Sequence, residues 1–189
     1  MNIITKTFKH IALVSKHRWF VFVYAVKAGI PIRGLLHDLS KFSPTEFCES
    51  VKYYNGGRSP LHVCREDIGY SRAWLHHKGR NKHHLEYWED ISKNGRIGVF
   101  PPYKYIIEAV CDKISAGRTY LGKKWNEKEP IKYWIDIESK APVTKHPATM
   151  EFMTTVLQKL ADEGVNAALK RKYLKNLYNE LIKKYDVKR

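Results

Sequence analysis

The sequence predicts an all-α protein that folds as one helical bundle. Of its 189 residues, 43% are apolar, which is enough to fill one hydrophobic core without disulfide bonds. Glycine, proline and capping residues recur along the chain in the order that marks the ends of helices. Apolar residues recur at helical intervals, most clearly at Met150, Met153, Leu157 and Leu160. These three observations favour helices throughout the chain.

Glycine, proline and capping residues set the bounds of the first predicted helices. Gly29 followed by Pro31 is a typical helix stop, so a first helix is expected over residues 5–28. The run Ser43-Pro44-Thr45-Glu46 is a capping box, which begins a helix that the next glycine pair ends. Between these two helices, a short one is expected over residues 34–42.

The middle of the chain is expected to remain helical. Residues 58–64 are expected to form a loop, and helices are expected over residues 66–77 and 82–92 on either side of a turn at Gly79-Arg80-Asn81. Asn94-Gly95 could turn a hairpin, but its flanks do not alternate apolar and polar residues. This pair is therefore expected to lie in a loop.

Proline and glycine also bound the C-terminal helices. Pro101-Pro102 begins a long helix that is expected to end near Leu121, and a weaker helical pattern covers residues 131–139. A helix from Pro147 is expected to end at Gly164. The last helix carries one apolar stripe: Leu169, Tyr173, Leu177, Leu181 and Tyr185. We therefore expect a domain over residues 1–145, with two accessory helices over residues 146–189 packed on it.

Charge and composition narrow the classes of partner. The chain has 34 Lys and Arg against 19 Asp and Glu, a formal net charge of +15, which favours a phosphate-bearing small molecule or a nucleotide, with nucleic acid as a second candidate. The three cysteines form no CxxC pair, so we expect no disulfide framework and a reducing, cytoplasmic location. The uncharged apolar run from Trp19 to Val26 is far shorter than the ~20 residues that cross a bilayer, so no membrane partner is expected.

Histidines and carboxylates recur on the predicted helices in a pattern that suits a metal ion. His17, His37, Asp38 and Asp112 would supply nitrogen and oxygen ligands from separate helices, which is how helical bundles build metal sites. The pairs His76-His77 and His83-His84 flank the predicted turn and could supply a second ion. Loop length favours His77 in the first pair, and a helical restart near Asn81 favours His84 in the second.

Other polar residues near these positions have competing interpretations. The histidine pairs could instead form a basic, solvated turn, and Glu108 could be a surface carboxylate or, like His76, a group that orients a ligand from outside. Asn81 could cap a helix or orient a ligand. His10, His62 and His146 have no partner in the sequence and are not assigned to the site. Candidate substrate-binding residues are Lys41, Arg80, Asn81, Lys82, His83, Lys113 and Arg118.

The order His17, then His37-Asp38 within HDLSKF, then Asp112 resembles the H…HD…D signature of the HD-domain superfamily. Members of that superfamily are all-α, metal-dependent phosphohydrolases and phosphodiesterases. The resemblance implies that these four residues are metal ligands, that Lys41 contacts phosphate or water, and that the two histidine pairs supply the extra ligands of dinuclear members. The strings HKGRNKHH, HDLSKFSPTEF and EAVCDKISAG are also similar to a bacterial and phage family of unknown function.

The leading hypothesis is a divalent-metal-dependent phosphohydrolase or phosphodiesterase that acts on a nucleotide or small phosphate ester. It would use one or two ions of manganese, iron, nickel, zinc or magnesium, with Asp38 and Lys41 as catalytic residues. A phage-encoded copy would act in the host cytoplasm. The superfamily resemblance also allows a mixed-valent di-iron oxygenase. A third hypothesis is a non-enzymatic protein that binds nucleic acid or a phosphate ligand.

Overall fold

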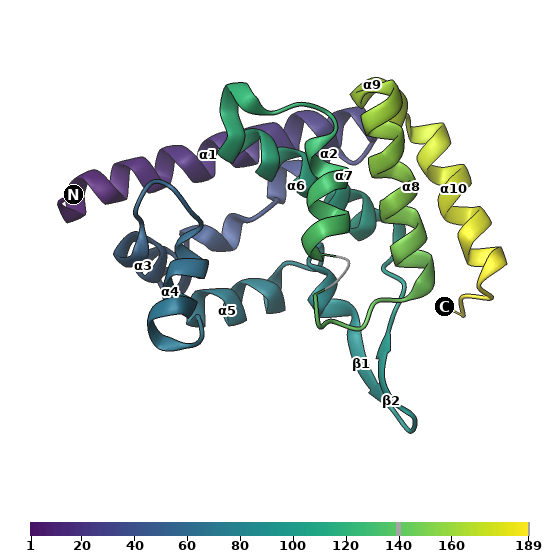
Figure 1. Ribbon diagram of the computed structural model, residues 1–189, viewed down its shortest axis with the longest axis horizontal. Helices are drawn as coiled ribbons and strands as arrows, with labels where there is room; N and C mark the ends of the chain where they lie inside the picture. The colour runs from purple at the N-terminus through teal and green to yellow at the C-terminus, as the bar shows by residue number, and fades with distance from the viewer. Residues whose placement is uncertain (139–140, 189) are drawn as a thin grey trace.

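The computed structural model describes residues 1–138 and 141–188, and within them the fold is all-α apart from one β-hairpin. Figure 1 shows α1 running from the N-terminus along one side of the molecule, with α3, α4 and α5 below its first half and α8 and α10 at the far end. The α-helices are α1 (Ile3–Lys27), α2 (Pro31–Leu36), α3 (Pro44–Tyr53), α4 (Pro60–Ile68), α5 (Arg72–Arg80), α6 (Tyr103–Leu121), α7 (Glu129–Tyr133), α8 (Pro147–Glu163), α9 (Val165–Ala168) and α10 (Arg171–Lys184). Short turns of 3₁₀-helix are η1 (Leu39–Phe42), η2 (Leu85–Trp88) and η3 (Gly122–Lys124), a π-helical turn η4 covers Trp134–Glu138, and the strands are β1 (Glu89–Ser92) and β2 (Gly95–Gly98).

The hydrophobic core lies where the second half of α1 meets α6, α8 and α10. Each of these helices supplies fully or almost fully buried apolar side chains, including Val21, Ile107, Leu157 and Leu174. The hydroxyl of Tyr178 on α10 also donates to the carbonyl oxygen of Pro101 at 2.9 Å. The C-terminal helices therefore share the core that positions α1 and α6.

A close contact between α1 and α2 brings two histidines together. Gly34 on α2 packs against Ala25 and Phe22 of α1, and a Cβ at residue 34 would collide with the Cβ of Ala25. Because glycine has no Cβ, the two helices can approach closely at this point. The chain that leaves α2 then places His37 beside His17 of α1, with their Nε2 atoms 3.3 Å apart.

The expected helices at both ends of the chain and after Pro101-Pro102 are confirmed, but residues 34–42 do not form one helix. The α2 helix ends at Leu36, and Asp38 adopts a left-handed backbone with φ 54° before η1 begins. Aspartate tolerates this conformation better than most residues. His37 and Asp38 therefore lie at a break between two helical segments.

The expected loop over residues 58–64 and helix over residues 66–77 are also wrong. The α4 helix begins at Pro60, which fits the first turn of a helix, and it ends at Gly69 with φ 82°. Ser71 then caps α5, because its hydroxyl accepts a hydrogen bond from the Trp74 backbone N–H at 2.9 Å. Two short helices therefore replace one longer helix.

The region after α5 contains a hairpin where a helix and a loop were expected. After η2, β1 pairs antiparallel with β2, with Glu89 opposite Gly98 and Ser92 opposite Gly95. Gly95 has φ 102°, which suits a tight turn, and most hairpin side chains are exposed, so no apolar face marks the strands.

The helix expected over residues 131–139 divides into α7 and η4, and its last residue lies outside the described residues.

Within residues 1–138 and 141–188, no helix is both long enough and apolar enough to cross a bilayer.

Gly34→Ala should destabilise the protein, because the added methyl group would force α2 away from α1. Overpacking costs about 1–3 kcal/mol, which outweighs the roughly 1 kcal/mol that alanine gains over glycine in a helix. Gly79→Ala on α5 is the matched control, because a Cβ there meets no atom of the described residues within 4 Å. Urea denaturation should show a lower midpoint for Gly34→Ala and an equal or higher midpoint for Gly79→Ala; equal midpoints for both variants would contradict the close contact.

Candidate metal centre

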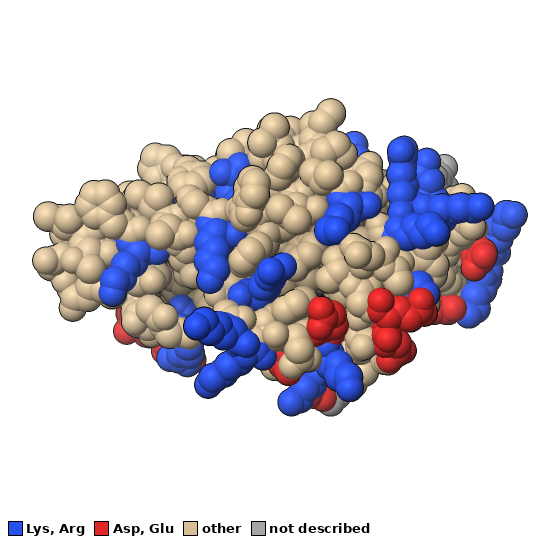
Figure 2. All heavy atoms as spheres, turned by 90° about the horizontal axis from the view of Figure 1, so that it is seen from above, with Lys and Arg blue, Asp and Glu red and all other residues tan. Residues whose placement is uncertain are grey.

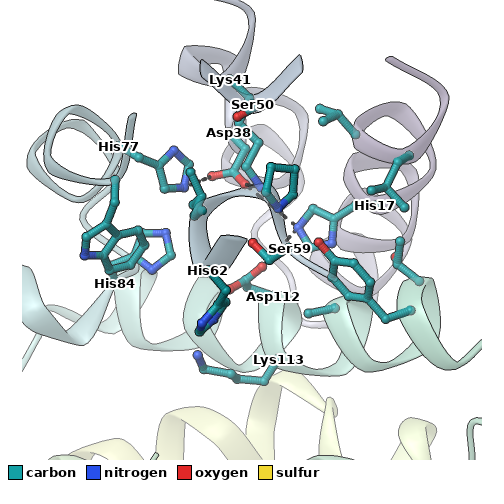
Figure 3. A pocket seen from close by; sticks show the side chains of 18 of the residues that line it. His17, Asp38, Lys41, Ser50, Ser59, His62, His77, His84, Asp112 and Lys113 are labelled. Atoms are coloured by element: carbon teal, nitrogen blue, oxygen red, sulfur yellow. Dashed lines mark ion pairs between the residues drawn. The ribbon is translucent and has the colours of Figure 1, made fainter. Parts of the chain in front are cut away.

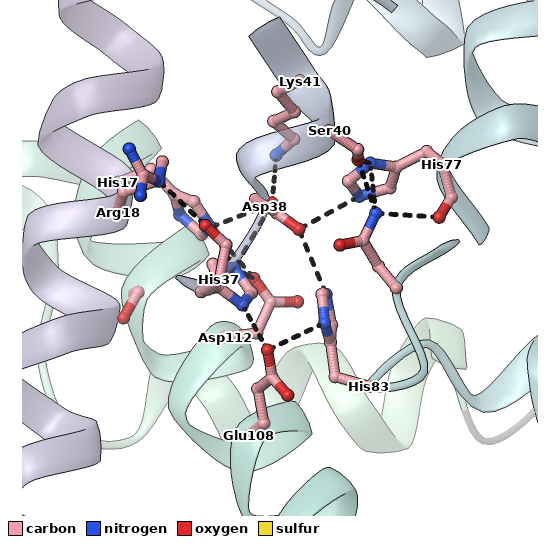
Figure 4. Close-up of polar contacts among 12 residues, drawn as sticks. His17, Arg18, His37, Asp38, Ser40, Lys41, His77, His83, Glu108 and Asp112 are labelled. Atoms are coloured by element: carbon pink, nitrogen blue, oxygen red, sulfur yellow. Dashed lines mark hydrogen bonds and ion pairs between the residues drawn. The ribbon is translucent and has the colours of Figure 1, made fainter. Parts of the chain in front are cut away.

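Side chains from α1, the α2–η1 break and α6 meet in one buried group. The Nε2 atom of His17 lies 3.0 Å from Oδ1 of Asp112, and Nε2 of His37 lies 3.3 Å from Oδ2 of Asp38 (Figure 4). All four residues are at most 9% exposed. The four residues expected from the sequence to be ligands therefore lie together in the structure.

A second group of imidazoles lies on the other side of Asp38. Its Oδ1 atom is 3.3 Å from Nε2 of His77 and 3.5 Å from Nε2 of His83. Ligand atoms of Asp38, His77, His83 and His84 all lie within 4.8 Å of one another, as do those of His17, His37 and Asp38. Asp38 therefore belongs to both groups and offers one oxygen to each.

Two glutamates orient the central imidazoles from outside. Oε1 of Glu108 lies 3.0 Å from Nδ1 of His37, and Oε2 of Glu46 lies 2.7 Å from Nδ1 of His77. In both cases the carboxylate faces one ring nitrogen and leaves Nε2 directed at Asp38. This arrangement of carboxylate and histidine is usual around metal-binding imidazoles, since it fixes the tautomer and the ring orientation.

The structure separates the members of each histidine pair. His77 points inward, as expected, while Nδ1 of His76 contacts Glu46 at 2.7 Å. His84 lines the cavity in front of Asp38, whereas His83 lies between Asp38 and Glu108 and is 2% exposed. His77 and His84 are therefore the members that face the cavity.

The protonation states of these groups follow from burial and from their neighbours. Burial lowers the pKa of His17 and keeps that of His84 well below its ordinary value, so both imidazoles are neutral. Burial alone would raise the pKa of Asp38 and Asp112, but the facing imidazoles hold both well below the ordinary range. Burial would likewise lower the pKa of His37, but the carboxylates of Asp38 and Asp112 raise it well above its ordinary value. His17 and His84 are therefore in the neutral state that a divalent ion binds, whereas His37 would have to release a proton when an ion binds.

Several buried polar atoms in this centre fit a bound cation. Within the described part of the chain, Nε2 of His84 is buried without a hydrogen-bond partner, while Oδ1 of Asp38 and both ring nitrogens of His83 make ion-pair contacts of 3.3–3.5 Å that lack hydrogen-bond geometry. Such atoms are rare in folded proteins, because each costs about 1–3 kcal/mol when it is left unpaired. Nitrogen and oxygen donors of this kind suit hard or borderline divalent ions. The residues present could therefore hold one ion in each group, with Asp38 shared.

The centre opens into a cavity of about 380 Å³. Figure 3 shows His17, His77 and His84 arranged around Asp38 and Asp112 at this cavity. Basic and apolar side chains complete its lining, among them Lys41, Arg65, Lys113, Leu61 and Trp74. A neighbouring cavity of about 520 Å³ is also lined by Lys113. The cavity can therefore take a ligand that is anionic at one end and apolar in another part.

Two of the expected substrate-binding residues, Lys41 and Lys113, line this cavity. Three others do not: Arg80, Lys82 and Arg118. Arg80 donates to Nε2 of His76 at 2.6 Å, and Arg118 donates to the hydroxyl of Tyr24 at 2.7 Å. Lys82 lies over the ring of Tyr87. Helical spacing alone could not show that these cations face away from the centre.

Asn81 and His83 lie within the polar centre and do not line the cavity, so the structure does not support a substrate contact for either. The Asn81 amide donates to Oγ of Ser40 at 2.7 Å and to the carbonyl oxygen of His77 at 2.9 Å. Asn81 is also the residue at which α5 ends. It therefore fixes the end of the helix that carries His77.

Sequence reasoning missed Glu46, His10 and His62. Glu46 was explained by the capping box, and its N–H does face Ser43 Oγ, but its carboxylate contacts the histidine pair on α5. His10 and His62 both line the cavity. The spacing of seven residues between His10 and His17 was an available signal, since it places both on one face of α1.

Comparison with known proteins finds one family. A family model described as "Family of unknown function (DUF5662)" matches residues 6–159. No curated protein and no solved structure matches the chain.

The buried imidazole of His10 should make the protein less stable in mild acid. Burial, with a further contribution from Lys41, lowers the pKa of His10 from 6.5 to about 4. Between these two values the unfolded chain binds more protons than the folded chain, so stability falls as the pH drops through this window. The effect amounts to at most about 3 kcal/mol.

Urea denaturation in chelator, from about pH 7.5 to about pH 4, should therefore show a steeper loss of stability for the wild type than for His10→Phe. Taking the difference between the two proteins removes the contribution of the other titrating groups. Parallel pH profiles would show that His10 keeps an ordinary pKa in the folded state.

Proposed function

The chain belongs to this family of unknown function, and we propose that it is a divalent-metal-dependent phosphohydrolase that acts on a phosphate ester. One observation carries the proposal: a buried carboxylate, Asp38, is shared by two groups of imidazoles at the wall of a cavity with basic side chains. The resemblance to the H…HD…D signature agrees with this arrangement. The positive net charge of the chain also favours an anionic substrate.

The ligands for two ions follow from the two groups. His17, His37, Asp38 and Asp112 would hold one ion, and Asp38, His77 and His84 would hold the other. Bound divalent ions lower the pKa of a coordinated water and polarise phosphoryl oxygens. The mixed ligand set is compatible with several ions, because imidazole suits zinc, iron and nickel, and carboxylate suits manganese and magnesium.

The side chains of the cavity would bind and orient the substrate. Lys41, whose Nζ lies 2.7 Å from Oδ2 of Asp38, would contact a phosphoryl oxygen beside the centre. Arg65 and Lys113 would neutralise the remaining phosphate charge. In the reaction, a water oxygen bonds to phosphorus, the ester P–O bond breaks, and the alcohol leaves with a proton, giving inorganic phosphate or a monoester.

Lys and Arg are prominent on one face of the molecule, whereas the buried centre is rich in carboxylates. Figure 2 shows Lys and Arg side chains spread over one face of the molecule, while Asp and Glu gather towards its edge. Four buried carboxylates surround the imidazoles, and two of them, Asp38 and Glu108, have a Lys or Arg partner. The other two, Asp112 and Glu46, have imidazoles as ion-pair partners, so a bound cation would balance the site.

Purified protein should contain a divalent metal and hydrolyse members of a nucleotide and phosphate-ester panel in a chelator-sensitive manner. Asp38→Asn should lose both metal and turnover, because it removes a ligand charge shared by both ions. Asp67→Asn on α4 is a control, since Asp67 is an exposed carboxylate that accepts from Tyr53. Elemental analysis and phosphate release would measure both properties.

The same measurements separate the rival functions. Iron whose absorbance responds to oxygen, with no phosphate release, would favour a di-iron oxygenase. Metal-free protein that binds nucleotides in the presence of chelator would favour a phosphate-binding module. Equal metal content in the wild type and Asp38→Asn would contradict the proposed centre.

Binding of the ion held by Asp38, His77 and His84 should depend on Glu46, although Glu46 is not itself a ligand. Glu46→Gln weakens the contact that orients His77, so the affinity for one ion should fall about 10–100-fold while the other ion stays bound. Glu49→Gln is the matched control on α3, because Glu49 accepts from Ser71 and from the backbone of α5. Metal titration by calorimetry would count the sites, and identical isotherms for the two variants would contradict the role of Glu46.

A further inference from the structure

The cavity extends from the metal centre along α1 to His10. His10 precedes His17 by seven residues, so the two lie on one face of the helix, about 10 Å apart along its axis. Both line the same cavity, and Leu13 and Val14 line it between them. A ligand with its phosphate at the centre could therefore reach His10 with its other end.

The imidazole of His10 is buried without a hydrogen-bond partner. It is 5% exposed, and neither of its ring nitrogens has a partner in residues 1–138 or 141–188. The rings of Phe47 on α3 and of Tyr54, the residue after α3, pack against it, with centroids 5.6 and 6.1 Å away. An imidazole that has no hydrogen-bond partner and is packed against aromatic rings at a cavity wall leaves a hydrogen bond open to a ligand group.

Further polar groups accompany His10 at this end of the cavity. Ser50 follows Phe47 by three residues, on the same face of α3, is 8% exposed, and lines the cavity. Lys41 also lines the cavity; its Nζ lies 2.7 Å from Oδ2 of Asp38, and its charge helps to lower the pKa of His10. This end of the cavity therefore offers groups that can form hydrogen bonds with a ligand.

The chemistry of His10 selects the ligand group. Because burial lowers its pKa to about 4, the imidazole is neutral near pH 7 and offers one donor and one acceptor. A hydroxyl group can accept from the protonated ring nitrogen or donate to the unprotonated one, whereas an anionic group would be held more strongly by a cation. The apolar side chains of Leu13 and Val14 suit the carbon chain between the two ends of the ligand.

We propose that His10, together with Ser50, binds a hydroxyl group on the alcohol part of the phosphate ester and so selects hydroxylated esters, such as sugar or nucleoside phosphates, as substrates. This inference rests on the proposed function, because it places the phosphate at the metal centre. His10 is a residue of substrate recognition and contacts no reacting atom.

Binding of two probes to metal-loaded protein tests the proposal. Inorganic phosphate reaches only the centre, whereas ribose 5-phosphate carries hydroxyl groups beyond it. His10→Phe should lower the affinity for ribose 5-phosphate about tenfold and leave that for inorganic phosphate unchanged, because a lost hydrogen bond in a buried site is worth roughly this factor. His10→Gln keeps a donor and an acceptor and should retain most of the affinity.

Thr149→Val is the control for burial alone. Thr149 on α8 is 2% exposed, and among the described residues its hydroxyl has no partner, but it does not line the cavity. Both Thr149→Val and His10→Phe should raise the stability of the ligand-free protein, because each removes unpaired buried polar atoms. Only His10→Phe should change the ratio of the two affinities.

The outcomes separate the two proposals. Equal affinity of the wild type and His10→Phe for ribose 5-phosphate would overturn the role of His10 and leave the phosphate site standing. If His10→Phe lowered the affinity for inorganic phosphate as much as that for ribose 5-phosphate, the role of His10 in binding the hydroxyl group would also be overturned. The substitution would then have disturbed phosphate binding at the metal centre. If wild-type protein loaded with metal binds neither probe, the phosphohydrolase proposal and the role of His10 both fail.

Discussion

The buried carboxylate of Asp38 is the group on which the polar interior depends. It is 1% exposed, with Oδ2 facing Lys41 and His37 and Oδ1 facing His77. An ionised carboxylate out of water costs several kcal/mol unless it is paired, so cations and imidazoles must surround it when the helices close. The left-handed backbone at Asp38 places its side chain between the two imidazole groups.

Around this carboxylate, the polar groups form layers. The imidazole of His37 contacts Glu108, which in turn accepts from Arg33 at 2.9 and 2.6 Å. On the other side, the imidazole of His77 contacts Glu46, which also faces His76, the acceptor for Arg80. Each layer fixes the side chain within it, so the central imidazoles keep one orientation. The buried polar atoms that lack a hydrogen-bond partner destabilise the ligand-free protein, and a bound cation would pair with them.

The apolar core supports this centre from one side. The second half of α1 packs against α6, and α6 packs against α8 and α10, which fixes the two helices that carry His17 and Asp112. The first half of α1 leaves that core and lines the cavity at His10 and Val14. One long helix therefore joins the packed end of the molecule to its polar end, and the spacing of residues along it sets where a ligand can be held.

Local signals in the sequence determined the all-α class, the capping box at Ser43 and the histidines and aspartates of the centre, because caps, helix stops and residue types act over a few residues. The chain could not show the break at Asp38 or the exposed hairpin, since neither carries an apolar pattern. Nor could it show that Glu46 turns to the histidines, that Arg118 turns away, or that His10 shares the cavity. Those placements depend on how helices distant in sequence pack, and only the tertiary structure decides which side of each helix is buried against another.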